Sequence, residues 1–377
     1  MTRLFIDVHI LQTVPPSNIN RDDTGSPKSA VYGGVPRARV SSQAWKRATR
    51  QMFKELLDPA TLGVRTKRVV ELVAARISTL DPSQPDPESL AAAALKAAKI
   101  ELEKPKRAKK GEQNPDDEPE QSKYLLFLSA SQIDRLAQLA IASADGDTPI
   151  DKAAASAAAQ GDNSIDVALF GRMVADANDL KVEAAAQVAH AISVHQVSSE
   201  FDYFTAVDDR APDHNAGAGM LGYVEFNSST LYRYATVSVK ALRDNLGDDT
   251  ATVRAIENFL IAFVKSMPTG KQNTFANRTL PEVVLISVRT DQPVNLVGAF
   301  EEPVNAVGSA RATIATKALV ARLQSVEQNY GDGSTENFLV ALGDGAGELS
   351  ALGTPAPFTD IVTSVGQKVT AALGSRS

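Results

Sequence analysis

The stretch L-F-I-D-V-H-I-L at residues 4–11, followed by V-S-S-Q-A-W-K-R-A-T-R at 40–50, sets the start of the fold. In the first part, the apolar residues Leu4, Ile6, Val8 and Ile10 alternate with their neighbours. Alternation with a period of two is typical of a strand with one buried face. The chain therefore begins with a predicted half-buried strand.

A helix is predicted next, over about residues 42–57. Either Ser41 or Ser42 can cap its N-terminus, because a serine hydroxyl accepts from an N–H of the first turn. One apolar stripe has the spacing i, i+3, i+7, i+11 and contains Trp45, Ala48, Met52 and Leu56. The opposite side contains Gln43, Lys46, Arg47, Arg50 and Lys54. These donors, together with the positive end of the helix dipole, suit a phosphate backbone.

Patterns in the second half of the chain predict the remaining elements of a complete core. Two strands are predicted at 222–226 and 230–239, a helix at about 248–266 and a strand at 281–288. The order β-α-β-β-α-β is that of the ferredoxin-like or RRM-type core. We therefore expect an α+β fold in which this core is interrupted by a large helical insertion and by an extended β-hairpin arm.

The insertion is alanine-rich, with helices predicted at 68–80, 88–103, 131–142 and 150–160, and another helix near 182–194 before the arm. Residues 103–123 are nearly devoid of apolar side chains and are predicted to form a mobile surface loop.

The charge distribution is uneven along the chain. The whole protein has 39 basic and 45 acidic residues, but residues 1–68 contain 12 basic and 5 acidic ones, a local net charge of +7. Seven of these cations fall between residues 18 and 50: Arg21, Lys28, Arg37, Arg39, Lys46, Arg47 and Arg50. Such a concentration favours a polyanion site over an ordinary solvated surface.

Composition excludes several classes of protein. The 377 residues include no cysteine, so disulfides and thiolate metal sites are excluded. The N-terminus lacks the pattern of a signal peptide, and no apolar run approaches the roughly 20 residues that span a bilayer. We expect a cytoplasmic protein with no membrane contact, and we predict no cofactor and no metal.

Eight motifs occur in an order that resembles one family. They are N-R-D-D (20–23), Y-G-G (32–34), V-S-S-Q-A-W-K-R-A-T-R (40–50), V-A-L-F-G-R-M (167–173), A-H-A-I-S-V-H-Q-V (189–197), D-Y-F-T-A-V-D-D (202–209), E-F-N-S-S-T-L-Y-R-Y-A (225–235) and K-Q-N-T (271–274). In this order and spacing they resemble the backbone subunit of the type I-E CRISPR surveillance complex Cascade, the CasC family of the RAMP superfamily. The resemblance runs to about residue 280.

The resemblance implies a hand-like organisation. The RRM-type palm would comprise 1–59, 185–196 and 227–377, the last part including the C-terminal helices. Residues 60–184 would form the helical fingers, with the mobile loop 103–123, and residues 197–226 the thumb hairpin. The implied function is non-catalytic: six copies would form a filament along CRISPR RNA, kink it regularly and present the other bases to target DNA. The implied partners are CRISPR RNA, target DNA through that RNA, further copies of this chain and other Cascade subunits.

The resemblance also implies RNA contacts at particular residues. The phosphate-holding groove of the palm would contain Arg21, Lys28, Ser41, Gln43, Lys46 and Arg50. Three further residues of the same motifs and of the basic stripe complete this set: Asn20, Ser42 and Arg47. Met173 would lie on the fingers side of the RNA kink and Thr205 and Leu221 on the thumb. Lys271 and Gln272 would contribute from the loop after the second palm helix.

Two alternatives stay open. Related backbone subunits of type III complexes cleave RNA with a metal and an aspartate in the corresponding loop, a role that Asp22 or Asp23 would take here. Adjacent aspartates are equally typical of a turn. The second alternative is an assembly protein whose basic patch binds an acidic partner. The histidines are predicted to be structural, because His190 and His195 do not have the i, i+4 spacing of a helical zinc pair.

Overall fold

The structure is a computed structural model that describes residues 3–105, 118–173, 178–206, 220–343 and 345–374. A large antiparallel sheet and several helices confirm the predicted α+β class. The chain divides into two compact units. The first comprises Met1–Met52, Gln187–Val239 and Ile256–Ser377, and the second comprises Phe53–Ala186 and Lys240–Ala255.

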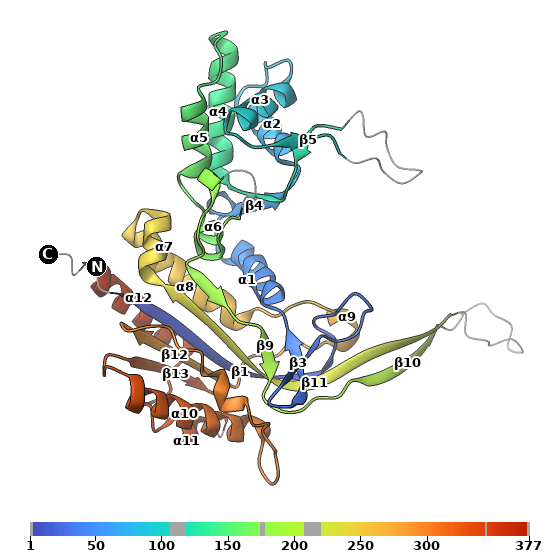
Figure 1. Cartoon of the computed structure of the whole chain (residues 1–377), viewed down its shortest axis with the longest axis vertical. Coiled ribbons are helices and arrows are strands. Elements are labelled where there is room, and N and C mark those ends of the chain that lie inside the picture. The colour runs from blue at the N-terminus through green and yellow to red at the C-terminus, as the bar shows by residue number, and fades with distance from the viewer. Residues whose placement is uncertain (1–2, 106–117, 174–177, 207–219, 344, 375–377) are drawn as a thin grey trace, which may run out of the picture. The chain divides into compact units, whose positions relative to one another are not determined.

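A nine-stranded sheet forms the framework of the first unit (Figure 1). Seven strands follow the order β13-β12-β1-β11-β9-β3-β2, and β8 and β10 each pair with β11. The strands are β1 (Phe5–Ser17), β2 (Ser29–Tyr32), β3 (Val35–Val40), β8 (Ala186–Val188), β9 (Ala191–Ser193), β10 (Glu200–Ala206), β11 (Met220–Ser238), β12 (Val283–Arg289) and β13 (Glu336–Ala341). β1 is central, antiparallel to β11 on one side and to β12 on the other.

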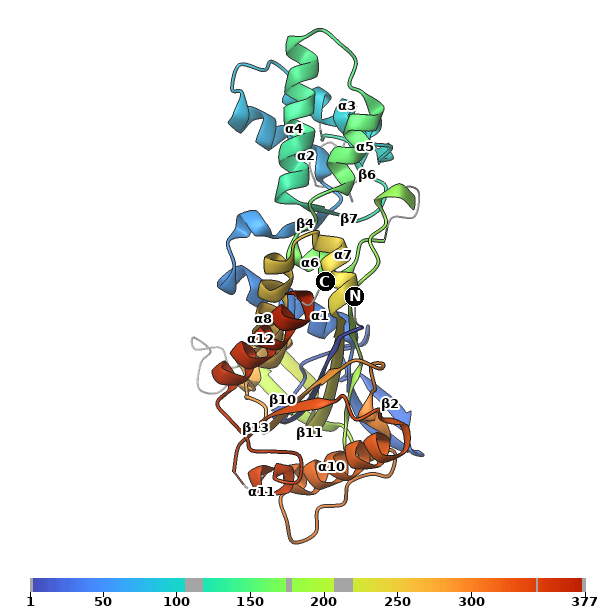
Figure 2. The same cartoon turned by 90° about the vertical axis from the view of Figure 1, so that its left-hand side faces the viewer.

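Helices cover both faces of this sheet (Figures 1 and 2). α10 (Arg311–Tyr330) and α11 (Gly345–Leu349) lie on one face, and residues 256–265 of α8 (Asp249–Lys265) lie on the other with α12 (Phe358–Gly374). β1 is therefore buried continuously from Ile6 to Gln12, and the prediction of a half-buried strand is wrong. The unit also contains α9 (Gln272–Phe275), the 3-10 helix η5 (Leu296–Phe300) and the start of α1 (Ser42–Leu56).

A buried arginine connects α1 and α8 to the sheet. The guanidinium carbon of Arg233, in β11, lies 3.7 Å from the ring centre of Trp45 and 4.7 Å from that of Phe263. Arg233 donates hydrogen bonds to Gln12 Oε1 (2.6 Å) and to the Phe263 carbonyl. Burial lowers the pKa of Arg233 to about 9, so the group remains charged at neutral pH. These contacts offset part of its desolvation and fix the start of α1 on the sheet.

The buried face of α1 differs from the predicted stripe. Trp45 and Ala48 are buried as predicted, but Leu56 is 39% exposed, whereas Thr49 and Phe53 are buried. The Phe53 ring stacks on Phe170, with 6.3 Å between the ring centres. Leu56, in the last turn, lies beyond this contact, so the helix buries its aromatic residue instead.

Residues 182–194, predicted as a helix, contain the strands β8 and β9. Ile192 pairs with Tyr232 of β11 on one side and with Arg39 of β3 on the other. Pairing on both sides satisfies the backbone groups of β9 in the sheet, and this tertiary environment overrides the helical propensity of the alanines. The helix prediction is therefore wrong.

The structure differs from the predicted secondary structure at three other places. Residues 222–239, predicted as two strands, lie mostly within the single strand β11. The Gly33–Gly34 turn, with φ of +60° and +79°, connects two strands that the sequence had not predicted, β2 and β3. The helix predicted at 88–103 is α3 (Pro87–Ala97); it ends early because Lys99 has φ of +64° and Leu102–Glu103 forms a strand.

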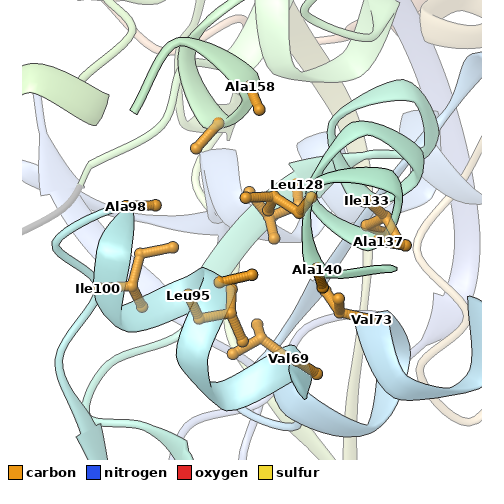
Figure 3. Close-up of a cluster of buried hydrophobic side chains, with 14 of the residues drawn as sticks. Val69, Val73, Leu95, Ala98, Ile100, Leu128, Ile133, Ala137, Ala140 and Ala158 are labelled. Carbon is orange, nitrogen blue, oxygen red and sulfur yellow. The ribbon is translucent and has the colours of Figure 1, made fainter. Parts of the chain in front are cut away.

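The second unit is mainly helical. Its helices are α2 (Val69–Leu80), α3, α4 (Ala130–Asp145), α5 (Lys152–Gln160), α6 (Ile165–Phe170) and α7 (Val239–Leu246), with the 3-10 helices η1 (Pro59–Thr61) and η3 (Asn178–Leu180). Two small sheets pair β4 (Gly63–Thr66) with β7 (Leu126–Ser129) and β5 (Leu102–Glu103) with β6 (Gln121–Ser122). Figure 3 shows the apolar cluster that holds α2, α3, α4 and α5 together, where small residues such as Ala137, Ala140 and Ala158 pack among Val73, Leu95 and Leu128.

Two predicted segments are described only in part. Residues 106–117 of the loop 103–123 and residues 207–219 of the hairpin 197–226 lie outside the described residues. None of the helices in the described ranges has the length and hydropathy that a membrane crossing requires.

Candidate nucleic-acid interface

The loop after β1 brings several predicted site residues together. The backbone N–H of Lys28 donates to the carbonyl of Asn20 (2.9 Å), and the N–H of Arg39 donates to the carbonyl of Lys28 (2.9 Å). The Asn20 side chain accepts from the N–H of Ser41 (2.8 Å). The loop, β3 and the start of α1 therefore meet at one place. A pocket lies there, and its wall includes Ser17, Asn20, Lys28, Arg39 and Asn227.

The loop is also attached to the base of the β10–β11 hairpin. The side-chain amide of Asn18 donates to the carbonyls of Gly25 and Glu225, both at 2.9 Å. The Ser26 hydroxyl donates to Glu225 Oε1 (2.9 Å). Arg21 is exposed in this loop, and its backbone forms an isolated antiparallel β-bridge with Pro27. These contacts give the loop a defined conformation and leave Arg21 accessible.

Asp22 shapes the turn within this loop. Its Oδ1 accepts from the Thr24 N–H (2.9 Å), the Thr24 hydroxyl (2.7 Å) and the Ser26 N–H (3.0 Å). These hydrogen bonds lower the pKa of Asp22. Asp23 beside it is exposed. Within the described ranges, no three histidine, aspartate or glutamate side chains are grouped as metal ligands.

The start of α1 has the predicted cap. Ser41 precedes the helix, and its Oγ accepts from the Ala44 N–H at 3.3 Å. Gln43 and Arg47 are exposed, and Ser42, Lys46 and Arg50 are half-buried. Burial lowers the pKa of Lys46. The polar side of the helix therefore presents amide and cationic donors, as the spacing predicts.

The loop that carries Lys271 and Gln272 lies against the backbone of residues 18–19. A Cβ atom at Gly270 would come within 2.5 Å of the Ile19 carbonyl oxygen and 2.7 Å of the Asn18 carbonyl oxygen. Such a close approach requires glycine. Lys271 follows in the left-handed region with φ of +50°. The structure thus places Lys271 and Gln272 near the loop that contains Asn20 and Arg21.

The two predicted thumb residues face each other across the hairpin. Thr205 in β10 pairs with Leu221 in β11, next to the last described pair. Thr205 is exposed, whereas the side chain of Leu221 and the tip at 207–219 lie outside the described residues. Closer to the base, the rings of Tyr203 and Tyr223 have centres 5.4 Å apart, and both residues are exposed.

Met173 lies in the second unit and is 87% exposed. The preceding Arg172 is buried and donates to the carbonyls of Leu180 (2.6 Å) and Ala159 (3.1 Å) and to Gln132 Oε1 (3.0 Å). Arg172 therefore fixes the backbone from which Met173 projects.

Two cations on β3 have opposite surroundings. Arg37 is fully buried and donates to four backbone carbonyls, those of Tyr32 (3.2 Å), Ser193 (2.9 Å), Phe300 (2.9 Å) and Glu301 (3.1 Å). Arg39, two residues later, points to the other face and lines the pocket. A count of charges along the sequence does not distinguish Arg37 from Arg39. They differ because side chains two residues apart on an irregularly paired strand have different surroundings in the fold.

His190 contacts Arg39, which lines the pocket. Its Nδ1 lies 3.1 Å from Nη1 of Arg39. Burial, Arg39 and Lys28 lower the pKa of His190. His195, by contrast, is structural as predicted: its Nε2 accepts from the Thr230 N–H (3.2 Å), and its Nδ1 lies 2.8 Å from the Gln196 carbonyl.

Comparisons with known proteins identify the family of the chain. No curated protein matches the chain. The chain is similar to a chain of a solved structure described as "CRISPR RNA-guided surveillance complex, pre-nicking", with a TM-score of 0.82 and 32% identity, covering 97% of this chain and 100% of the other. A second similar chain, from a "CRISPR RNA-guided surveillance complex", has a TM-score of 0.72 and 28% identity, covering 97% of this chain and 99% of the other. The family profile of the CT1975-like proteins matches residues 6–362, and the chain therefore belongs to the CT1975-like protein family.

Proposed function

We propose that this chain is the non-catalytic backbone subunit of a type I-E Cascade, of the CasC type within the RAMP superfamily, and that it holds the phosphate backbone of CRISPR RNA. The observation that carries the proposal is the convergence of Asn20, Lys28 and Ser41 at one place, beside a pocket that Asn20 and Lys28 line, with Lys271 close to the same loop. The similarity to chains of CRISPR RNA-guided surveillance complexes supports it.

In this proposal the first unit contains an RRM-type palm. The order β12-β1-β11-β9 supports this assignment, because all the neighbouring strands are antiparallel and α1 and α8 lie in the two crossovers. Residues 60–184 act as the fingers and the hairpin at 197–226 acts as the thumb. Six copies stack along the RNA with the other Cascade subunits, in the cytoplasm, and the bases between kinks pair with target DNA.

The donors of the site favour backbone binding over base recognition. Arg21 is an exposed cation, Lys28 and Lys271 are half-buried cations, and the start of α1 offers backbone N–H groups. Such groups bind phosphates and carry no sequence information directly. Base pairing then reads the sequence while the protein holds the shape, a division that the Cas9-type systems also use.

The proposal assigns no cleavage to Asp22 and Asp23. Oδ1 of Asp22 accepts three hydrogen bonds that close the turn. The carboxylate of Asp22 therefore has a structural role. We expect bound RNA to remain intact in Mg²⁺ or Mn²⁺. Metal-dependent cleavage that is abolished by Asp22→Ala or Asp23→Ala would instead favour a type III-like nuclease.

The direct test replaces the two half-buried cations of α1. The Lys46→Ala, Arg50→Ala double variant removes two phosphate contacts in the proposal. For single-stranded RNA, the slope of log affinity against log salt should decrease in magnitude by about 0.7 for each contact, or about 1.4 in total. The affinity should decrease by a similar factor for RNAs of unrelated sequence.

Lys317→Ala is the matched control, because it removes an exposed cation of α10 outside the site. It should leave the slope unchanged. An unchanged slope in the double variant, or a loss restricted to particular sequences, would contradict backbone binding. Binding of acidic protein surfaces without RNA binding would favour the assembly-protein alternative.

A further inference from the structure

We propose that Arg39 and His190 form a phosphate-binding pair that extends the RNA contact surface. Arg39 would bind the phosphodiester directly, and His190 would act mainly as a positioning residue for Arg39. The inference rests on the proposed function, since the phosphate belongs to bound RNA, but it concerns two residues that the resemblance did not assign.

Arg39 is held at two points and retains free donor capacity. Its Nε donates to the Ser29 carbonyl (3.0 Å), and its Nη1 lies 3.1 Å from His190 Nδ1. A guanidinium has five N–H donors in a fixed plane, so three remain after these two contacts. A planar donor set of this kind binds phosphate oxygens in pairs. The two contacts therefore orient Arg39 for a ligand and do not consume it.

The contact with Arg39 determines which nitrogen of His190 carries the proton. Because Nη1 of Arg39 can only donate, Nδ1 of His190 must accept, and the proton of the neutral ring lies on Nε2. Burial and the positive charges of Arg39 and Lys28 keep the pKa of His190 below its ordinary value. His190 is exposed, so its Nε2–H provides a further donor beside the guanidinium.

The charge around the pair is uncompensated in the part of the chain that the structure describes. Neither Lys28 nor Arg39 forms an ion pair with a described carboxylate, although both line the same pocket. Arg289 shows the opposite arrangement, since it is buried between Asp291 and Glu327. Two cations in a concave site, with a neutral histidine donor beside one of them, favour an anionic ligand.

A purely structural role explains the pair less well. β3 and β9 are already joined by backbone pairing, Arg39 with Ile192 and Val40 with Ala191. The side-chain contact between Arg39 and His190 repeats a connection that the sheet provides. Arg37, on the buried face of the same strand, is the arginine that anchors β3 to its neighbours.

The experiment measures binding of the full chain to single-stranded RNA of mixed sequence over a range of salt concentrations. Arg39→Ala should weaken binding roughly tenfold, as expected for a lost charge-assisted hydrogen bond, and should reduce the salt slope by about 0.7. Arg39→Lys should keep the slope but bind more weakly than the native chain, because an ammonium lacks the planar donor pair. Lys317→Ala should match the native chain.

The role of His190 is separated by two substitutions. His190→Ala should weaken binding, and His190→Asn should restore most of it, because an asparagine oxygen can accept from Arg39 as Nδ1 does. Equal losses in the two variants would overturn the positioning role. Unfolding midpoints in urea verify the fold, and Arg39→Gln, which retains hydrogen bonding without the charge, replaces Arg39→Ala if that variant is unstable.

The outcomes distinguish this inference from the proposed function. If the native chain binds RNA but Arg39→Ala, or Arg39→Gln in its place, leaves affinity and slope unchanged, the inference is wrong and the proposed function stands. If the native chain binds no RNA, the proposed function itself is wrong, and this inference is wrong with it.

Discussion

Asp7 and His9 lie on β1, both of whose faces are covered, so each is a polar group that must be satisfied inside the first unit. Asp7 accepts from the Val294 N–H (2.8 Å) and from the Tyr234 hydroxyl (3.1 Å). His9 Nδ1 lies 2.9 Å from the Tyr232 hydroxyl. Alternation in the sequence placed both residues on a solvent face, because a sequence pattern does not show which elements cover a strand.

Burial raises the pKa of Asp7 to about 6. The folded chain therefore holds this proton more tightly than the unfolded chain, in which the ordinary value is 3.8. The contribution of Asp7 to the free energy of unfolding is full below about pH 4 and is lost as the pH rises through about 6. Between pH 4.5 and pH 7 this loss amounts to about 2 kcal/mol.

His9 acts in the opposite direction. Burial and Arg289 lower its pKa to about 3, so its contribution is present above its ordinary pKa of 6.5 and decreases as the pH falls toward 3. The two residues partly cancel in the native chain. A variant that removes one of them is needed to reveal the other.

Asp7→Asn cannot ionise but keeps a hydrogen-bonding side chain. We predict that its free energy of unfolding, relative to the native chain, decreases by about 2 kcal/mol when the pH is lowered from 7 to 4.5, because only the native chain gains stability from protonation. Urea unfolding at the two pH values measures this difference. The same difference at both pH values would show that Asp7 does not titrate in this range.

Arg37 and Arg39 show how far the site could be predicted from the sequence at this scale. The local excess of cations identified the correct segment, and motif matching placed Asn20, Lys28 and Ser41, which the structure brings together. The sequence could not show that Arg37 is buried under four carbonyls or that His190 meets Arg39 from a distant part of the chain. Both facts depend on β9 lying beside β3.

At the scale of elements, long periodic segments were predicted well and short ones poorly. Helices α2, α4, α5 and α8 lie close to their predicted ranges, because each has an apolar face that repeats over several turns. The helix prediction for residues 182–194 was wrong because a three-residue strand is too short to show a period in the sequence. Its conformation depends on pairing with β11 and β3, which lie far away in the sequence.

The hairpin is the element whose proposed role is most specific. Thr205 and Leu221 face each other near the end of its described part, and Met173 is an exposed apolar residue on the second unit. Exposed apolar side chains favour insertion into a partner, and apolar wedges between bases are a known means of kinking nucleic acids. We predict that Met173→Gly with Leu221→Gly leaves the fold and phosphate contacts intact but weakens the regular kink.

Chemical probing of assembled RNA measures this effect as the periodic exposure of single nucleotides. Val307→Gly is a suitable control, since Val307 is 88% exposed and lies outside the proposed site. Undiminished periodic exposure in the double variant would show that Met173 and Leu221 do not form the wedge.

In the proposed function, a whole molecule with net charge −6 binds a polyanion. It can do so because the first 68 residues carry a local +7 and because the pocket gathers cations from separate segments of the first unit. Repulsion from the acidic remainder is reduced by salt, which screens charges beyond roughly 10 Å at 0.1 M. Local arrangement of charge, and not net charge, therefore decides the partner.

Limited ribonuclease digestion of RNA assembled with the full chain tests whether the chain holds the RNA backbone at regular intervals. We expect protection of the RNA in segments of regular length, the same for unrelated sequences, and no cleavage when Mg²⁺ is present without ribonuclease. Regular protection requires repeated copies that hold the backbone independently of the bases. Digestion as uniform as that of free RNA, or protection restricted to one sequence, would contradict it.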